Sequence, residues 1–206
     1  MHLPARPITP EIVLLAYTRG AFPMAPPQKD QVEWFTCDPR AVVPLDARFH
    51  VPGSLRRTIR KGLFELRTDT AFGEVIRACA HDRAGSNRSW ISPTIIRVYE
   101  QLHRMGFAHS VEAWRSGTLV GGLYGVALGG AFFGESMFCR PQLGGTDASK
   151  VCLVALVERL RRGGYVLCDS QYANDHMRQF GVYELPAKSY LQLLEDALEV
   201  EARWVP

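Results

Sequence analysis

Two hydrophobic periods alternate along the chain, one typical of helices and one typical of strands. Residues 9–20, 70–82, 92–106 and 147–164 carry apolar side chains at helical spacing. Thr9 precedes Pro10 and Gly20 follows the first of these segments, as expected at helix ends. Three further helices are predicted from capping residues and shorter patterns, at residues 52–62, 174–181 and 186–199.

Strand patterns fill the stretches between these helices. Residues 108–138 predict consecutive strands that turn at Ser116-Gly117 and again at Gly129-Gly130. Residues 165–171 predict a buried strand directly after the longest helix. Shorter strands are expected within residues 32–44 and 63–69, whereas the proline-rich residues 22–30 are expected to form a loop.

This order of elements predicts the fold class α/β (α+β), with a mixed sheet flanked by helices. The composition changes near residue 40, after the proline-rich segment and the turn at Asp38-Pro39. We therefore expect a small N-terminal domain at residues 1–39 and a larger domain at residues 40–206.

Composition and charge narrow the class of protein. An apolar content of 47% is ordinary for a globular protein, and the net charge of +3 neither requires nor excludes a nucleic-acid partner. The five cysteines form no C-x-x-C pair, which favours reduced thiols over a disulfide framework or a zinc site. Because no signal peptide or long apolar run is visible, we expect a cytoplasmic protein without membrane association. No coiled-coil pattern is visible, so a monomer is expected.

An acid and an amide stand together where a buried strand ends, in the sequence LCDSQYANDH. Asp169 and Gln171 are two residues apart, so on a strand both side chains project from the same face. Polar residues at this place commonly cap the following helix, but Asn174 or Asp175 can do so. We therefore expect Asp169 and Gln171 to belong to the functional site.

A further acid, Glu135, lies in the apolar stretch GESMF. A buried carboxylate is costly unless it meets a cation. An acid on an edge strand that reaches solvent or pairs with an arginine, and a functional acid, are both open at this point.

Basic residues gather on the helix predicted at residues 52–62. Arg56 and Arg60, and likewise Arg57 and Lys61, are i,i+4 pairs of like charge, which repel. A solvated helix face is the ordinary explanation, and contact with a phosphate backbone is the functional one. Trp90, just before the next predicted helix, suits either packing or stacking on a nucleobase. The histidines show no spacing typical of metal ligands, and no serine hydrolase motif is present.

Several motifs occur in a fixed order along the chain. They are AYTRGAFPM, FTCDPRAV, AFGEVIRACA, SWIS, HSVEAWRSGTLVGGLYGVA, GESMF, ASK and DSQYANDH. Together they resemble the bacterial leucyl/phenylalanyl-tRNA–protein transferase family, from about residue 9 to the C-terminal WVP. The resemblance implies a small N-terminal domain and an acyltransferase domain of the acetyltransferase-like (GNAT-like) fold.

The resemblance also implies a reaction. Leucine or phenylalanine, with methionine as a further candidate, passes from its tRNA ester to the α-amine of a protein that begins with Arg or Lys. The product carries a destabilising N-terminus, which marks it for proteolysis. Aminoacyl-tRNA is a co-substrate in this reaction, and no cofactor is expected.

Residue roles follow from the same resemblance. Asp169, Gln171 and Glu135 match the catalytic positions. Trp90 and Met24 match contacts to the terminal adenosine of the tRNA, and Arg57 and Lys61 match contacts to its backbone. The pocket for the aminoacyl side chain corresponds to Leu123, Phe132, Met137 and Leu156.

Three positions depart from the family pattern. Met24 replaces a tryptophan, Leu123 a methionine and Leu156 a phenylalanine. These changes affect which donor amino acid is preferred and how tightly the end of the tRNA is bound. They do not change the expected class of reaction.

Aminolysis of an ester needs positioned reactants and a path for one proton. We expect the side-chain carbonyl of Gln171 to accept a hydrogen bond from the attacking amine, while Asp169 orients and polarises that amide. Glu135 is expected to hold either the aminoacyl ester or the cationic first residue of the acceptor.

Two other functions are compatible with parts of the sequence. One is an acyltransferase that uses acyl-CoA, for which the loop QLGGTDASK resembles a pyrophosphate-binding turn. The other is a non-catalytic homologue that binds RNA or peptide, which the methionine at position 24 favours.

Overall fold

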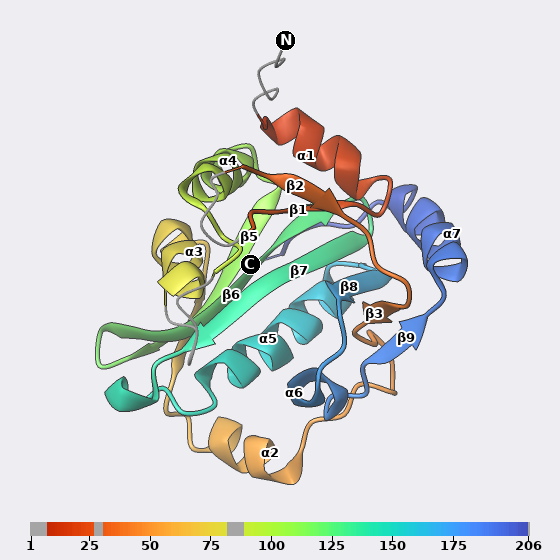
Figure 1. Ribbon diagram of the computed structural model, residues 1–206. Coiled ribbons are helices and arrows are strands. Elements are labelled where there is room, and N and C mark those ends of the chain that lie inside the picture. Colours follow the sequence, from red (N-terminus) through yellow and green to blue (C-terminus); the bar gives the residue numbers. More distant parts are fainter. Residues whose placement is uncertain (1–7, 27–30, 82–88, 206) are drawn as a thin grey trace.

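A seven-stranded sheet runs through the centre of the molecule, and helices cover both of its faces (Figure 1). The computed structural model describes residues 8–26, 31–81 and 89–205. In these residues the large sheet has the strand order β4-β5-β6-β7-β8-β3-β9, and β1 and β2 form a second, two-stranded sheet. The strands are β1 (Phe22–Met24), β2 (Glu33–Phe35), β3 (Arg40–Val42), β4 (Glu65–Thr68), β5 (Ala108–Arg115), β6 (Thr118–Leu128), β7 (Ala131–Cys139), β8 (Leu167–Gln171) and β9 (Tyr183–Leu185). The helices are α1 (Pro10–Tyr17), α2 (Gly53–Arg60), α3 (Phe72–His81), α4 (Pro93–Arg104), α5 (Ala148–Arg162), α6 (Asp175–Arg178) and α7 (Ala187–Leu198).

The α/β class predicted from the sequence, with a mixed sheet flanked by helices, is confirmed. Local sequence signals explain where several helices begin. The side chains of Thr9 and Ser92 accept hydrogen bonds from the main-chain N–H groups of Ile12 and Ile95. Asn174 caps α6 in the same way, which leaves Asp169 and Gln171 free of that role.

The predicted hairpin at residues 116–117 is also confirmed. Arg115 pairs with Thr118, so the turn between β5 and β6 contains only Ser116 and Gly117. Both residues have positive φ, 49° and 76°, as a tight two-residue hairpin turn requires.

The loop expected at residues 22–30 is wrong at its start, because Phe22–Met24 forms β1. This strand pairs with β2, and Phe22 lies opposite Phe35. Pro23 has no main-chain N–H to offer, but a short edge strand tolerates proline. The remaining residues 27–30 lie outside the described part of the chain.

Alternate residues of the strands enter two different cores. Phe133 packs with residues of α1, α3 and α4, whereas its neighbour Phe132 packs with residues of α5. This is the two-residue period of a strand covered on both faces. The sheet is therefore buried on both sides along β6 and β7.

The N-terminal segment shares a core with the rest of the molecule. Val13, Tyr17 and Phe22 belong to the same apolar cluster as the helices α3 and α4. β3, which begins at Arg40, lies inside the large sheet between β8 and β9. The division at residues 39 and 40 into two domains stays a prediction.

A parallel pair of strands, β7 and β8, sets the geometry of the site. Their pairing runs from Ala131 and Leu167 to Phe133 and Asp169. Two residues further along each strand stand Glu135 and Gln171. Because the carboxyl ends of parallel strands meet at one edge, these two side chains are brought to the same place.

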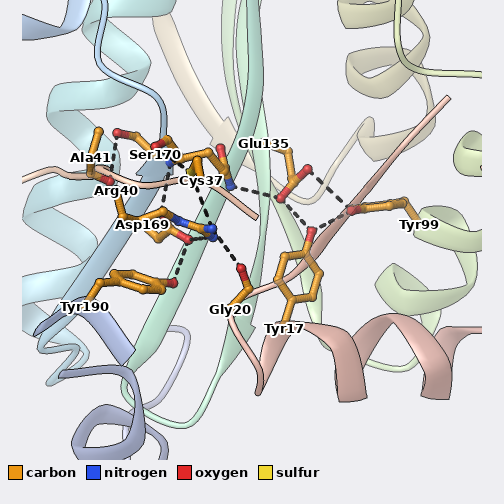
Figure 2. A network of polar contacts seen from close by, with 11 residues as sticks. Tyr17, Gly20, Cys37, Arg40, Ala41, Tyr99, Glu135, Asp169, Ser170 and Tyr190 are labelled. Atoms are coloured by element: carbon orange, nitrogen blue, oxygen red, sulfur yellow. Dashed lines mark hydrogen bonds and ion pairs between the residues drawn. The ribbon is translucent and has the colours of Figure 1, made fainter. Parts of the chain in front are cut away.

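The buried residue Arg40 connects four segments of the chain (Figure 2). Its side chain, 1% exposed, donates to both carboxylate oxygens of Asp169 in β8, at 2.8 and 2.5 Å. It also donates to the carbonyl oxygen of Gly20 at 2.8 Å, and its guanidinium lies over the rings of Phe22 and Tyr190. Arg40 thus ties the N-terminal segment and α7 to the centre of the sheet.

Replacement of this arginine by an apolar residue tests that role. Arg40→Met leaves the carboxylate of Asp169 buried without its cation, so we expect the free energy of unfolding to fall by about 3–5 kcal/mol. Urea denaturation measures this loss. Arg48→Met is the matched control, because Arg48 pairs with Asp46 on the surface and should leave the midpoint unchanged. Equal midpoints for the two variants would contradict the role of Arg40.

Candidate functional site

A pocket of about 170 Å³ opens between β7 and β8, beyond the point where the two strands pair. One part of its wall is apolar and the other is polar. The lining residues are Val43, Leu123, Tyr124, Gly134, Glu135, Ser136, Met137, Leu153, Leu156, Cys168, Asp169, Ser170, Tyr172, Asn174, His176 and Met177.

The apolar wall contains three of the four residues expected to contact an aminoacyl side chain. Leu123 comes from β6, Met137 from β7 and Leu156 from α5, and all three line the pocket. The fourth, Phe132, is fully buried behind the wall, where its ring lies 5.7 Å from that of Trp204. Leu153, one turn before Leu156 on α5, lines the pocket and was not expected from the sequence.

Asp169 is surrounded by hydrogen-bond donors and has no exposed surface. Its Oδ1 accepts from the Arg40 guanidinium and, at 2.9 Å, from the main-chain N–H of Gln171. Its Oδ2 accepts from Arg40 and, at 2.8 Å, from the hydroxyl of Tyr190. Four donors hold this carboxylate, so its task is to organise the surrounding chain.

Gln171 adopts a backbone conformation that side chains rarely take, with φ of 58°. Its N–H is held by Asp169, and its carbonyl oxygen accepts a hydrogen bond of 3.2 Å from the thiol of Cys37. Non-glycine residues in this region cost about 1–3 kcal/mol and are common at functional sites. These contacts, one on each side of the Cα atom of Gln171, stabilise this conformation.

This backbone changes the relation expected between Asp169 and Gln171. The sequence predicted that Asp169 orients the side-chain amide of Gln171. Asp169 instead binds the main chain of Gln171, and the side-chain Nε2 donates to Oε1 of Glu135 at 3.4 Å. Gln171 has a left-handed φ, and its side chain contacts Glu135 in place of Asp169.

Glu135 lines the pocket, and the pKa of its carboxyl differs strongly from the ordinary value. Burial, together with the negative charge of Asp169, raises the pKa of its carboxyl to about 7. The hydrogen bond from Tyr17, the charge of Arg40 and the hydroxyl of Tyr99 act in the opposite direction. Glu135 therefore exchanges between its charged and neutral forms near neutral pH.

Two tyrosines that the sequence analysis did not select complete the polar part of the site. The hydroxyl of Tyr17 in α1 donates to Oε1 of Glu135 at 2.5 Å, and it lies 2.5 Å from the hydroxyl of Tyr99 in α4. The hydroxyl of Tyr99 lies 3.4 Å from Oε2 of Glu135. Figure 2 shows both tyrosine side chains pointing toward Glu135.

Trp90 and Met24, the residues expected at the tRNA end, are neighbours in the structure. The N–H of Ala25, which follows β1, donates at 2.9 Å to the carbonyl oxygen of Trp90, three residues before α4 begins. Both side chains are half-buried against the core that contains Tyr17 and Tyr99. They are not part of the pocket lining.

The expected basic residues lie on another part of the surface. Arg57 is on α2 and Lys61 is its C-cap residue, and both are exposed. Together with Phe49 and Val51, α2 forms an open groove of about 720 Å³ against α5. In Figure 1, α2 lies at the opposite end of the molecule from α1 and α4.

Four residues of the site were not predicted from the sequence: Arg40, Tyr190, Tyr17 and Tyr99. One signal was available, because Arg40 is a charged residue directly before the apolar residues Ala41, Val42 and Val43. The tyrosines carried no such signal, since Tyr17 and Tyr99 stand at helical spacing among apolar residues.

In the part of the chain that the structure describes, no cluster of three or more histidine, cysteine, aspartate or glutamate side chains is arranged to hold a metal ion. None of the described helices has both the length and the apolar character needed to cross a membrane.

Comparison with known proteins connects this geometry to one family. Residues 42–195 match the family model described as leucyl/phenylalanyl-tRNA protein transferase, and residues 6–38 match the model of its N-terminal domain. A protein of Akkermansia muciniphila, named leucyl/phenylalanyl-tRNA–protein transferase, is 53% identical over 93% of this chain and 97% of its own length. A protein of Salinibacter ruber with the same name is 51% identical over 97% of this chain and 84% of its own length.

Solved structures with a similar backbone are more distant. A ribosomal-protein-alanine N-acetyltransferase of Brucella melitensis is 13% identical, with a TM-score of 0.40 over 56% of this chain and 86% of that chain. The C-terminal domain of a putative lysylphosphatidylglycerol synthetase of Agrobacterium fabrum is 12% identical, with a TM-score of 0.43 over 91% of this chain and 62% of that chain.

The two family models together cover most of the chain, and relatives at about half identity extend over nearly all of it. The chain belongs to the leucyl/phenylalanyl-tRNA–protein transferase family and is an aminoacyltransferase.

Proposed function

We propose that the protein moves leucine or phenylalanine from aminoacyl-tRNA to the N-terminal α-amine of proteins that begin with Arg or Lys, and so marks them for proteolysis. Methionine is a further candidate donor. The protein acts in the cytoplasm as a monomer and uses no cofactor. The observation that carries this proposal is the pocket between β7 and β8, whose lining combines an apolar wall with Glu135, the acid to which the side chain of Gln171 donates.

The two ends of the donor suit different parts of the site. A leucine or phenylalanine side chain fits against Leu123, Met137 and Leu156. The adenosine then extends toward Trp90 and Met24, where a tryptophan ring offers stacking and a thioether offers a polarizable contact. Phosphates farther along the tRNA have partners in Arg57 of α2 and Lys61 at its C-cap.

The reaction itself demands little more than position and proton transfer. An α-amine with a pKa of about 7.7–8 is partly neutral at physiological pH, so attack on an activated ester needs no strong base. Nε2 of Gln171 donates to Glu135, and the side-chain oxygen of the same amide accepts from the amine in this proposal. An amide at this place orients the amine without holding it in the ammonium form.

An acyl-CoA reaction is less compatible with the structure. A pyrophosphate would need open glycines and free N–H groups at the start of α5. A side chain at Gly145 would meet the carbonyl oxygen of Val120 at 2.3 Å, so this glycine serves packing against β6. Asp147 is the N-cap residue of α5, and its carboxylate already binds the ammonium group of Lys150 at 2.7 Å.

A non-catalytic homologue is also less compatible. Such a protein would have no need to keep the buried Arg40–Asp169 pair and the left-handed Gln171, both of which are costly to maintain. An assay of leucyl-, phenylalanyl- and methionyl-tRNA with peptides that begin with Arg, Lys or Ala tests the proposal. Transfer to the Ala-starting peptide at an equal rate would refute the acceptor preference.

Gln171→Ala removes the proposed acceptor of the amine hydrogen bond. We expect transfer to fall by about 10²-fold, because loss of the position of a reactant can cost about that much, while tRNA binding and the melting temperature stay unchanged. Gln192→Ala on the exposed face of α7 is the control and should keep full activity. Wild-type turnover in Gln171→Ala would refute this role.

Residue 156 should set the donor preference. Leu156→Val enlarges the pocket and raises the ratio of kcat/KM for phenylalanyl-tRNA to that for leucyl-tRNA, whereas Leu156→Phe lowers it. Pockets that differ by one methylene discriminate by about 1–3 kcal/mol, so changes of several-fold are expected. Leu160→Val, one turn further along α5 and outside the pocket lining, is the control. If Leu156→Val and Leu156→Phe change this ratio in the same direction, residue 156 does not set the donor preference by its size.

The basic residues of α2 should contribute to tRNA affinity by neutralising phosphates. The double variant Arg57→Ala/Lys61→Ala should weaken binding and reduce the slope of log K against log salt by about 0.7–0.9 for each phosphate that is no longer neutralised. Filter binding across a series of salt concentrations measures the slope. Lys188→Ala on α7 should leave it unchanged, and an unaltered slope in the double variant would assign α2 to a solvated surface.

A further inference from the structure

Four oxygen atoms form a closed ring in the polar part of the site (Figure 2). They are the hydroxyls of Tyr17 and Tyr99 and the two carboxylate oxygens of Glu135. Three contacts connect them: Tyr17 to Tyr99 at 2.5 Å, Tyr17 to Oε1 at 2.5 Å and Tyr99 to Oε2 at 3.4 Å. The carboxylate itself closes the ring.

A count of protons shows that this ring is one proton short when Glu135 is ionised. Each tyrosine contributes a single hydroxyl proton, so two protons serve three contacts. The proton of Tyr17 lies toward Oε1, and the proton of Tyr99 cannot serve both Tyr17 and Oε2. The longest contact, at Oε2, is the place where a third proton fits.

The electrostatics indicate which member of the ring gains and loses that proton. Burial and the nearby Glu135 raise the pKa values of Tyr17 and Tyr99 well above their ordinary range, so both phenols keep their protons. The pKa of Glu135, about 7, lies where a group can both accept and return a proton. The groups that surround this carboxyl are Tyr17 of α1, Arg40 of β3, Tyr99 of α4 and Asp169 of β8, with Tyr124 of β6 in the same pocket wall.

The other acid of the site is unsuited to this task. Asp169 already accepts four hydrogen bonds from Arg40, Tyr190 and the main chain, and none of its surface is exposed. Protonation of Asp169 would break its ion pair with a buried guanidinium. Gln171 accepts a hydrogen bond but does not hold a proton. Glu135 lines the pocket and connects to Gln171 on one side and to the tyrosines on the other.

We propose that the Tyr17–Tyr99–Glu135 ring takes the proton of the attacking amine and returns it to the ribose oxygen that leaves. This inference rests on the proposed function. Glu135 acts as the catalytic residue, and Tyr17 and Tyr99 position its carboxylate.

The step balances without any further reactant. The amine nitrogen forms a bond to the ester carbon and gives a proton to the Glu135 carboxylate. The bond between that carbon and the ribose 3′-oxygen breaks, and the neutral carboxylic acid donates the proton to this oxygen. The products are an amide and a ribose hydroxyl, and the ring returns to its starting state.

The ribose 2′-hydroxyl is the rival carrier of the proton, and the leaving group distinguishes the two. Two donors lack this hydroxyl: leucyl-tRNA that ends in 2′-deoxyadenosine and leucyl-tRNA that ends in 2′-fluoro-2′-deoxyadenosine. Fluorine makes the 3′-oxygen a better leaving group. If Glu135 protonates that oxygen, the wild-type protein transfers from both donors at similar rates.

Glu135→Gln keeps the shape of the side chain, but its amide cannot take up the amine proton and release it to the ribose oxygen. We expect transfer from the 2′-deoxy donor to fall by about 10²–10³-fold and transfer from the 2′-fluoro donor to fall much less, so the ratio of the two rates rises at least several-fold. An equal loss on both donors, down to no transfer at all, assigns Glu135 to binding and overturns the proposal. Absence of transfer from both donors by the wild-type protein assigns the proton to the ribose hydroxyl and also overturns it.

Tyr17→Phe tests the ring by a second measurement. The variant lacks the hydrogen bond that lowers the pKa of Glu135, so its carboxylate forms at higher pH and the rise of kcat/KM with pH moves upward. The acceptor amine titrates identically in both proteins and cancels from the comparison. Tyr165→Phe, a buried tyrosine outside the pocket lining, is the control and keeps the wild-type profile. An unshifted profile in Tyr17→Phe overturns the positioning role.

The proposed function fails independently of these outcomes. If the wild-type protein does not transfer leucine from ordinary leucyl-tRNA to an Arg-starting peptide, the substrate assignment is refuted. If it does, the two measurements above concern only the path of the proton.

Discussion

Arg40 and Asp169 place a cation and an anion together inside the protein, where neither side chain is exposed to more than a trace of water. The desolvation of two charges is expensive, so such pairs persist where geometry compensates for it. Here the aspartate also accepts from Tyr190 and from the main chain of Gln171, and the arginine also donates to Gly20. One ion pair therefore fixes the end of β8, the N-terminal segment and α7 against one another.

This constraint separates the duties of the two acids in the site. Asp169 is saturated with donors and holds Gln171 in its left-handed conformation. Glu135 receives the side-chain amide of Gln171 and two tyrosine hydroxyls, and burial brings its pKa to about 7. The negative charge of Asp169 contributes to that elevated pKa, while the charge of Arg40 limits it. Asp169 therefore both holds the surrounding chain in place and raises the pKa of Glu135.

Much of the fold follows from the sequence because its signals are local. The caps at Thr9 and Asn174 and the hairpin at Ser116-Gly117 each depend on a few adjacent residues. The site depends on contacts between residues far apart in the chain, such as Arg40 with Asp169 and Tyr17 with Tyr99. Side-chain spacing on an ideal strand could not reveal that Gln171 leaves the strand conformation, and so it assigned the wrong partner to its amide.

The positions expected from the sequence to depart from the family pattern lie away from the network of hydrogen bonds. Leu123 and Leu156 belong to the apolar wall of the pocket, and Met24 lies beside Trp90 outside it. Substitutions at such places alter the shape offered to a side chain or a base while leaving the charges and protons in the centre unchanged. The buried polar network tolerates little change, because removal of one partner leaves another unpaired. The preferred donor amino acid can therefore change while the reaction stays the same. Leu123 and Leu156 are the residues of this chain at which such a change in preference can be measured.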